Sequence, residues 1–174
     1  MYESVLVPTD GNRRMPRVIE DAVSLAALCN GTVHALHAVD DAAYASIPEE
    51  ARDVVRERLR EDGEDATRQV AKHAIDSGVD VVREVRTGPP AHVIVSYAVE
   101  NDVDLIVMGT NGRTGYERYL LGSVAERVVR SAPMAVMTID LDGDTDAVGV
   151  IEEGLPAAID ADRTGDRTDD EQIE

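Results

Sequence analysis

Apolar and polar positions follow two alternating patterns along the chain. Short apolar runs of the kind that form buried strands are followed by stretches in which apolar residues recur every three or four positions, as on one face of a helix. Glycine, asparagine or proline stands at most of the junctions. The patterns predict strands at 3–9, 32–39, 79–87, 103–108 and 134–139, and helices at 16–30, 49–77, 91–101 and 123–131.

The regular succession of strands and helices predicts a doubly wound α/β domain. Strands joined through helices run parallel, with the helices packed on both faces of the sheet. The runs at 3–9 and 103–108 are almost continuously apolar, which is typical of central strands buried on both faces. The run at 79–87 alternates apolar and charged residues, as expected near a sheet edge. We therefore expect a five-stranded parallel sheet within a domain at residues 1–141.

The end of the chain has a different composition. Residues 142–174 contain 12 acidic and 2 basic residues, a net charge of −10, and residues 162–174 have no periodicity and few apolar side chains. Such a composition cannot bury enough apolar surface to offset the entropy lost on folding. The sequence predicts an acidic, disordered tail at 142–174.

Charge excludes several classes of function. The chain carries 35 acidic and 17 basic residues, a net charge of −18, so both nucleic acid and an anionic membrane would repel it.

No apolar run approaches the ~20 residues of a membrane span, and no signal segment precedes the first strand. Cys29 is the single cysteine, which excludes a disulfide framework and a cysteine metal site. We expect a cytoplasmic protein.

The basic residues indicate an adaptation to salt. Sixteen of the 17 are arginine, and Lys72 is the one lysine. Excess carboxylate with so little lysine favours a halophilic protein, because molar salt screens the self-repulsion of the surface. A basic protein partner is the alternative interpretation.

Glycines cluster between the fourth strand and the last helix, at positions 109, 112, 115 and 122. Glycine lets a ligand approach the backbone closely, and the free N–H groups at the start of the following helix attract phosphate. Alternatively, Ser123 only caps its own helix, because residues 123–126 read Ser-Val-Ala-Glu and form a capping-box pattern. No lysine follows Gly122 and no G-x-G-x-x-G follows a strand, so both common nucleotide fingerprints are missing.

The turn after the first strand offers a second candidate group. Residues 8–11 read Pro-Thr-Asp-Gly, and ligands of doubly wound sheets bind at the carboxyl ends of strands where the strand order reverses. If the first and fourth strands are neighbours, Asp10 and Gly109 face one crevice. The carboxylate of Asp10 could then bind ribose, adenine or a metal ion. As alternatives, Asp10 is a helix N-cap or a turn residue.

These motifs resemble the universal stress protein family. The spacing Gly109-x2-Gly112-x9-Gly122-Ser123 matches the ATP-binding signature of that family. The opening residues 5–11, Val-Leu-Val-Pro-Thr-Asp-Gly, are similar to its first strand and turn. Residues 121–126 and 132–137 are similar to it as well, so the resemblance extends to about Asp140.

The resemblance implies an adenine-nucleotide alpha-hydrolase-like fold with strand order 3-2-1-4-5 and a homodimer formed through the fifth strand. It also implies an ATP site, often with a divalent ion, here Mg or Mn. Adenine would lie near Pro8, Thr9, Asp10 and Val39. Ribose and phosphates would lie along Met108, Gly109, Gly112 and Arg113, and on the backbone amides of Gly122, Ser123 and Val124.

Three functions remain open on this sequence. The leading hypothesis is a stress-response protein that binds ATP as a signal or a stabilising ligand. A slow ATPase or autophosphorylating enzyme could use the same pocket, although Arg113 alone is thin support for phosphoryl transfer. A nucleotide-independent interaction protein acting through the acidic tail is the third. His34 and His37 are expected on opposite faces of one strand, so they cannot share a metal ion.

Overall fold

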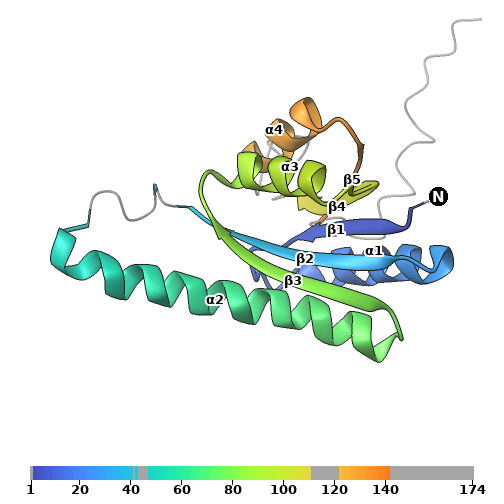
Figure 1. Ribbon diagram of the computed structural model, residues 1–174, viewed down its shortest axis with the longest axis horizontal. Coiled ribbons are helices and arrows are strands. Elements are labelled where there is room, and N and C mark those ends of the chain that lie inside the picture. Colours follow the sequence, from blue (N-terminus) through green and yellow to red (C-terminus); the bar gives the residue numbers. More distant parts are fainter. Residues whose placement is uncertain (1, 41, 43–46, 111–121, 142–174) are drawn as a thin grey trace, which may run out of the picture. The chain divides into compact units, whose positions relative to one another are not determined.

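The computed structural model describes residues 2–40, 42, 47–110 and 122–141. Five parallel strands alternate with four helices (Figure 1). The strands are β1 (Ser4–Pro8), β2 (Thr32–Val39), β3 (Asp80–Thr87), β4 (Leu105–Thr110) and β5 (Ala135–Asp140). The helices are α1 (Met15–Cys29), α2 (Glu49–Asp76), α3 (Pro90–Glu100) and α4 (Ser123–Ser131). The predicted boundary at residue 141 and the predicted tail concern residues 142–174, which lie outside the described residues, and both stay predictions.

The strand order is β3-β2-β1-β4-β5, as the resemblance implied. β1 is the central strand and pairs with β2 on one side and with β4 on the other. β3, the strand with alternating charges, forms one edge. The order reverses between β1 and β4, so the carboxyl ends of these two strands define the crevice in which ligands of such sheets bind.

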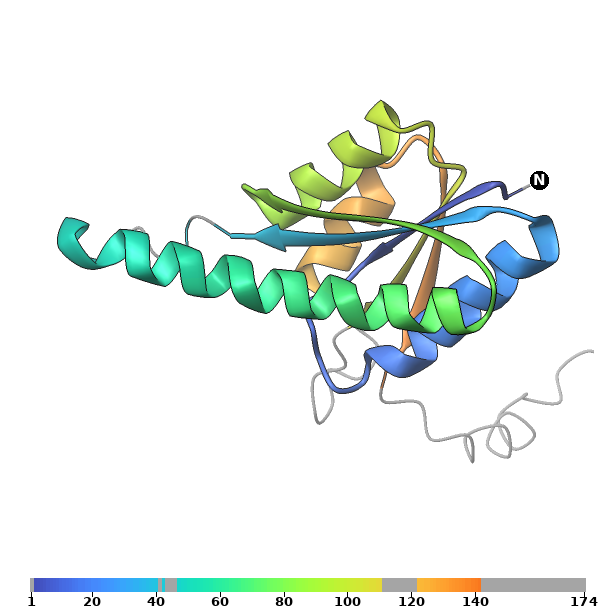
Figure 2. The same cartoon turned by 60° about the horizontal axis from the view of Figure 1, so that its bottom comes forward.

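Helices cover both faces of the sheet, as predicted (Figure 2). Val5 and Val7 of β1 face α1 and α2, whereas Leu6 between them faces α3 and α4. This alternation follows from the two-residue period of a strand. Each face has an aliphatic core of its own, and Tyr97 on α3 is the aromatic residue of the second core. None of the helices in the described ranges is long and apolar enough to cross a bilayer.

β4 differs from the prediction at both ends. It begins at Leu105, because Asp102 adopts a left-handed conformation with φ 48° that ends the turn after α3. It continues to Thr110, with Gly109 paired to Ile139 of β5. Gly109 is therefore part of the sheet and not of the loop that follows.

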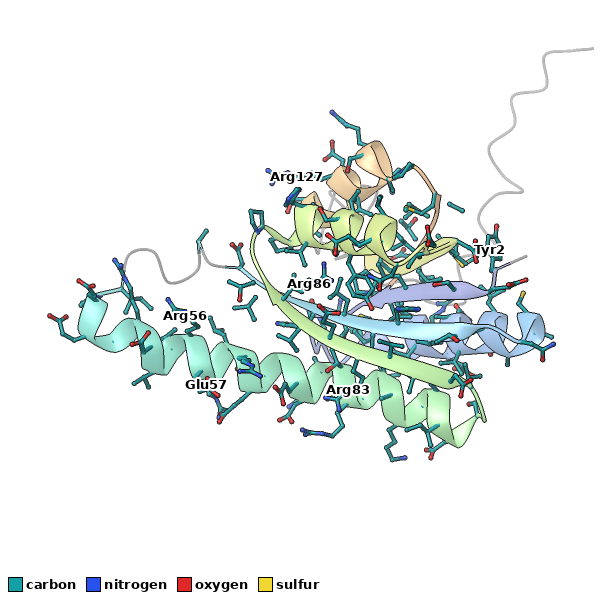
Figure 3. All side chains as sticks on the ribbon, viewed as in Figure 1. Tyr2, Arg56, Glu57, Arg83, Arg86 and Arg127 are labelled. Atoms are coloured by element: carbon teal, nitrogen blue, oxygen red, sulfur yellow. The ribbon has the colours of Figure 1, made fainter. Side chains whose placement is uncertain are left out.

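The first half of α2 extends past the strands that the second half covers (Figures 1 and 2). Its fully buried residues begin at Gly63 and continue to Ala74. Ala51, Val55 and Leu59 have helical spacing, but they stay exposed or half-buried. Arg56 and Glu57 lie on this half, beside exposed ion pairs along the helix (Figure 3). The predicted helix is confirmed, and the apolar spacing of its first half does not correspond to a buried face.

A polar network lies beside α3, on the face of the sheet opposite α2. The Tyr97 hydroxyl and His34 Nδ1 share a hydrogen bond of 2.8 Å. The Arg86 guanidinium lies 4.7 Å from the centre of the Tyr97 ring and donates to carboxylates of Glu84 and Glu100 at 2.6 Å each (Figure 3). Burial lowers the pKa of His34, whereas burial and then the charge of Glu84 raise the pKa of Tyr97.

Acid should weaken the fold through His34. Because its pKa is lower in the folded state than in the unfolded chain, the unfolded chain binds more protons as the pH falls. The stability that neutral His34 provides is complete above the unfolded pKa of ~6.5 and is lost as the pH falls toward the folded pKa. Urea unfolding of wild type and His34→Gln between pH 7.5 and 5 measures this. The two curves should diverge with acid, and parallel curves would contradict the assignment.

Gly63 allows α2 to pack closely on β2. A Cβ atom at this position would lie 2.5 Å from Cδ2 and 3.0 Å from Cγ of His37. Alanine is favoured over glycine in a helix by ~1 kcal/mol, but overpacking costs ~1–3 kcal/mol. We expect Gly63→Ala to lower the free energy of unfolding by about 1 kcal/mol net. Thermal unfolding measures it, and the sign should reverse in a His37→Ala background. If Gly63→Ala instead stabilises the wild-type protein, the His37 ring can move aside at little energetic cost.

Candidate functional site

A cavity of about 200 Å³ opens at the carboxyl ends of β1 and β4. Eight of the predicted site residues line it. They are Pro8, Thr9, Asp10, Met108, Gly109, Gly122, Ser123 and Val124. The prediction that β1 and β4 are neighbours is confirmed, and their adjacency brings the β1 turn and the start of α4 to the same cavity.

In the turn after β1, side-chain oxygens accept hydrogen bonds from backbone N–H groups two residues ahead. Thr9 Oγ1 accepts the N–H of Gly11 at 3.2 Å, and Asp10 Oδ1 accepts the N–H of Asn12 at 2.9 Å. Asn12 Oδ1 in turn accepts the N–H of Arg14 at 3.1 Å. The Thr9 contact is an ST turn, and the Asp10 and Asn12 contacts are Asx turns. Asp10 is thus a turn residue through one carboxylate oxygen, while its side chain is exposed at the cavity. It is not the N-cap of α1, which is Arg14.

Thr9 also ties this turn to β2. Its N–H donates to the carbonyl of Leu36 at 2.9 Å, and its carbonyl accepts a hydrogen bond from His37 Nδ1 at 2.8 Å. The side chain is 6% exposed. The edge of the cavity between β1 and β2 is therefore fixed from both strands.

The start of α4 lies at the cavity. The helix begins at Ser123, with Gly122 as its N-cap residue, and within the described ranges no side chain caps its first turn. The capping-box alternative is therefore wrong, because Ser123 already belongs to the helix. The first N–H groups of the helix and the positive end of its dipole lie at the cavity. Such an arrangement binds anions, phosphate in particular.

Gly109 leaves room for a neighbour from the end of β5. A Cβ atom on it would lie 2.7 Å from Cδ1 of Leu141. Leu141 lines the cavity and also packs on the core beneath α1 and α2. The glycine is thus needed for close packing at the wall of the cavity, a role that the sequence pattern did not indicate.

The remaining predicted residues are placed differently. Val39 is buried, and its carbonyl accepts the N–H of Gly88 at 2.9 Å. It is not among the residues that line the cavity, whereas its neighbour Ala38 is. Gly112 and Arg113 lie outside the described residues.

Half of the residues that line the cavity were not predicted from the sequence. These residues come mainly from β2 and the starts of α1 and α3. They are Met15, Leu36, His37, Ala38, Pro90, Ile94, Ala125 and Leu141. Position was the available signal, since Leu36 to Ala38 end a strand and Pro90 begins a helix at the same edge of the sheet. Their residue types carry no signature of their own.

Metal binding has no dedicated ligand set in the described part of the chain, where no three His, Cys, Asp or Glu side chains come together. His34 bonds Tyr97 in the core under α3, whereas His37 contacts α2 on the opposite face. The two histidines thus lie on opposite faces of β2, as predicted.

The sequence pattern of the Universal stress protein family matches residues 1–140. The chain belongs to this family. Among the universal stress proteins, MJ0531 of Methanocaldococcus jannaschii is 38% identical over 140 residues, which are 80% of this chain and 82% of that protein. The universal stress protein of Methanothermobacter thermautotrophicus is 35% identical over 139 residues, 78% of this chain and 94% of its own.

Solved structures of universal stress proteins share the fold. That of the hypothetical protein MJ0577 superposes with a TM-score of 0.73 and 28% identity, over 83% of this chain and 99% of its own. Another universal stress protein was solved in complex with cAMP. It has a TM-score of 0.58 and 26% identity, over 80% of this chain and 98% of its own. The adenine nucleotide alpha-hydrolase-like fold expected from the sequence is confirmed.

Proposed function

We propose that this universal stress protein binds ATP in the cavity at the carboxyl ends of β1 and β4, and acts as a cytoplasmic stress-response protein. The observation that carries the proposal is the start of α4 at Gly122 and Ser123, which no side chain of the described residues caps and which shares one cavity with the turn at Asp10. One side of this cavity suits phosphate, and the other offers a carboxylate to a ribose or base. The nucleotide serves as a signal or a stabilising ligand.

Apolar side chains between these two polar ends suit a purine. Leu36, Ile94 and Met108 line the cavity, and all three are at most 5% exposed. A flat base is bound mainly by apolar contact, with a few polar groups to fix its orientation. The relative solved with cAMP, 26% identical to this chain, supports an adenine nucleotide as the class of ligand.

Mg²⁺ or Mn²⁺ would be bound mainly by the phosphates of the nucleotide and not by a set of protein ligands. Mg²⁺ keeps most of its water and is commonly held by phosphate oxygens with one or two carboxylates. Asp10 is the carboxylate that lines the cavity and can complete such a shell. Gly112 and Arg113 complete the phosphate side of the proposal, on the strength of the glycine signature alone.

Dimerisation through β5 is part of the proposal. β5 is the last strand of the sheet, and Met137 on it is 38% exposed. An exposed edge strand carries unpaired backbone groups that a second copy can bind. The net charge of −18 further supports a protein that works in concentrated salt.

Gly122→Val should weaken ATP binding at least about 100-fold, because the branched side chain would cover the amides that approach the phosphates. Gly122 has φ −56° and ψ 150°, a conformation open to valine, so the fold should survive. Isothermal calorimetry on nucleotide-stripped protein in molar KCl with Mg²⁺ measures the affinity. Ala27→Val, on the exposed face of α1, adds bulk far from the cavity and should bind normally. Normal affinity in folded Gly122→Val would exclude the phosphate assignment.

A further inference from the structure

The side chain of His37 holds the peptide group that joins Thr9 to Asp10. Its Nδ1 lies 2.8 Å from the carbonyl oxygen of Thr9. A carbonyl oxygen only accepts, so Nδ1 is the donor of this hydrogen bond. Thr9 and Asp10 both line the cavity, so the bond fixes the orientation of the peptide group at the ligand-binding part of the turn.

The same ring packs on the backbone of α2. A Cβ atom on Gly63 would lie 2.5 Å from Cδ2 and 3.0 Å from Cγ of His37, so the helix backbone and the ring are in close contact. Cδ2 and Nδ1 are bonded to opposite sides of Cγ. The imidazole therefore fills the space between Gly63 of α2 and the carbonyl of Thr9, and it contacts both.

These contacts leave the ring little room to move by itself. The hydrogen bond of 2.8 Å is close to the lower limit of ~2.7 Å for an N–H···O bond. Val85 of β3 lies beside the ring as well, because the same Cβ atom on Gly63 would be 3.2 Å from Val85 Cγ1. A shift of α2 toward the sheet must therefore displace the Thr9–Asp10 peptide group or break its hydrogen bond to His37.

One helical turn further along, α2 contacts the β1 turn directly. Gly11 has φ 72°, and a Cβ atom on it would lie 3.3 Å from Cβ of Ala66. Ala66 follows Gly63 by three residues and so lies on the same face of the helix. α2 thus reaches the turn on both sides of Asp10, through His37 at Thr9 and without an intermediate at Gly11.

We propose that His37 is a positioning residue that couples the packing of α2 to nucleotide binding. Through the ring, the helix sets the orientation of the Thr9–Asp10 peptide group. This inference rests on the proposed nucleotide function and concerns its regulation. Coupling free energies are reciprocal, so a change in the packing of α2 alters the affinity for the nucleotide, and bound nucleotide stabilises that packing by the same factor.

The test uses Gly63→Ala, which adds one methyl group on the α2 side of the ring. The variant should displace the Thr9–Asp10 peptide group through His37 and weaken ATP binding about fivefold. Gln69→Gly is the matched control, because Gln69 is an exposed residue of α2 and glycine there destabilises the helix without changing its packing on the sheet. The control should bind ATP normally, since a loss of stability alone does not change the affinity of folded protein.

The double variant Gly63→Ala, His37→Ala isolates the ring. Without the imidazole the methyl group has room, so Gly63→Ala should no longer change the affinity when it is compared with His37→Ala alone. Calorimetry on nucleotide-stripped, full-length protein in molar KCl with Mg²⁺ gives the dissociation constants of ATP, at a temperature at which every variant is folded.

Hydrogen exchange of the wild-type protein is a second measurement that needs no variant. Because residues 63–67 of α2 include the contacts to His37 and Gly11, ATP should slow the exchange of their amides more than that of residues 71–74. Stabilisation of the whole domain would slow both groups alike, so equal slowing along α2 would contradict the coupling.

The affinities can overturn the role of His37 in three ways. Gly63→Ala could bind ATP as wild type does, Gln69→Gly could lose as much affinity as Gly63→Ala, or the loss could persist in the His37→Ala background. In each case the proposed function stands, because wild type binds ATP. Wild type that does not bind ATP would overturn the proposed function and this inference together.

Discussion

Tyr97→Ala should lower the free energy of unfolding by about 4 kcal/mol, the usual cost of deleting a buried aromatic ring. Tyr97 is 0% exposed and is the aromatic residue of the core beneath α3 and α4. Its removal would leave a cavity, deprive His34 of the hydroxyl at 2.8 Å and take the ring from under Arg86. The core has small aliphatic residues around it, among them Ala98 and Ala125, which cannot fill the space.

Denaturant unfolding in molar KCl measures this cost. Tyr97→Phe is the control, since it keeps the ring and removes only the hydroxyl. It should cost about 1 kcal/mol, the net value of one hydrogen bond. A Tyr97→Ala variant that loses less than the Phe variant would mean that the ring does not support this core.

Gly31→Ala should cost about 3 kcal/mol, although alanine is a small residue. A Cβ atom on Gly31 would lie 2.8 Å from the carbonyl oxygen of Glu3 and 2.9 Å from that of Tyr2. Both contacts are with backbone, which cannot rotate away as a side chain can. The Glu3 carbonyl is also engaged, because it accepts the N–H of Thr32 at 2.8 Å at the start of the β1–β2 pairing.

Thermal unfolding of Gly31→Ala against wild type checks this expectation. Leu28→Ala, near the same end of α1, is the control, because Leu28 is 81% exposed and its loss should change the stability by less than about 0.5 kcal/mol. If Gly31→Ala proves as stable as the control, the chain near Tyr2 and Glu3 can move aside, and the close approach seen here has no energetic weight.

Local patterns predicted most of the fold because they depend on neighbours in the chain. The apolar run at β1 and the helical spacing of α1 can be recognised without knowing what they contact. The order of the strands is not a local property, and it came from the resemblance to a family. The overhang of α2 was missed for the same reason, since Val55 and Leu59 have helical spacing whether or not a strand lies beneath them.

The site was predictable where motifs mark it and not elsewhere. Glycine spacing and the Pro-Thr-Asp-Gly turn indicated the two ends of the cavity. The capping-box pattern at Ser123 gave a wrong alternative, because the same four residues fit a helix that starts one residue earlier. His37 carries no motif, and its place at the cavity depends on contacts with Thr9 and Gly63 that only the folded chain brings together.

The self-bonded turn from Thr9 to Arg14 has a thermodynamic consequence for any ligand. Each of its side-chain oxygens already restrains a backbone N–H two residues ahead, so these torsions are frozen before the ligand arrives. Ordering a loose loop on binding consumes part of the affinity as lost conformational entropy. On this side of the cavity that entropy is already lost when the chain folds. A ligand therefore binds to a preorganised turn and does not have to order it.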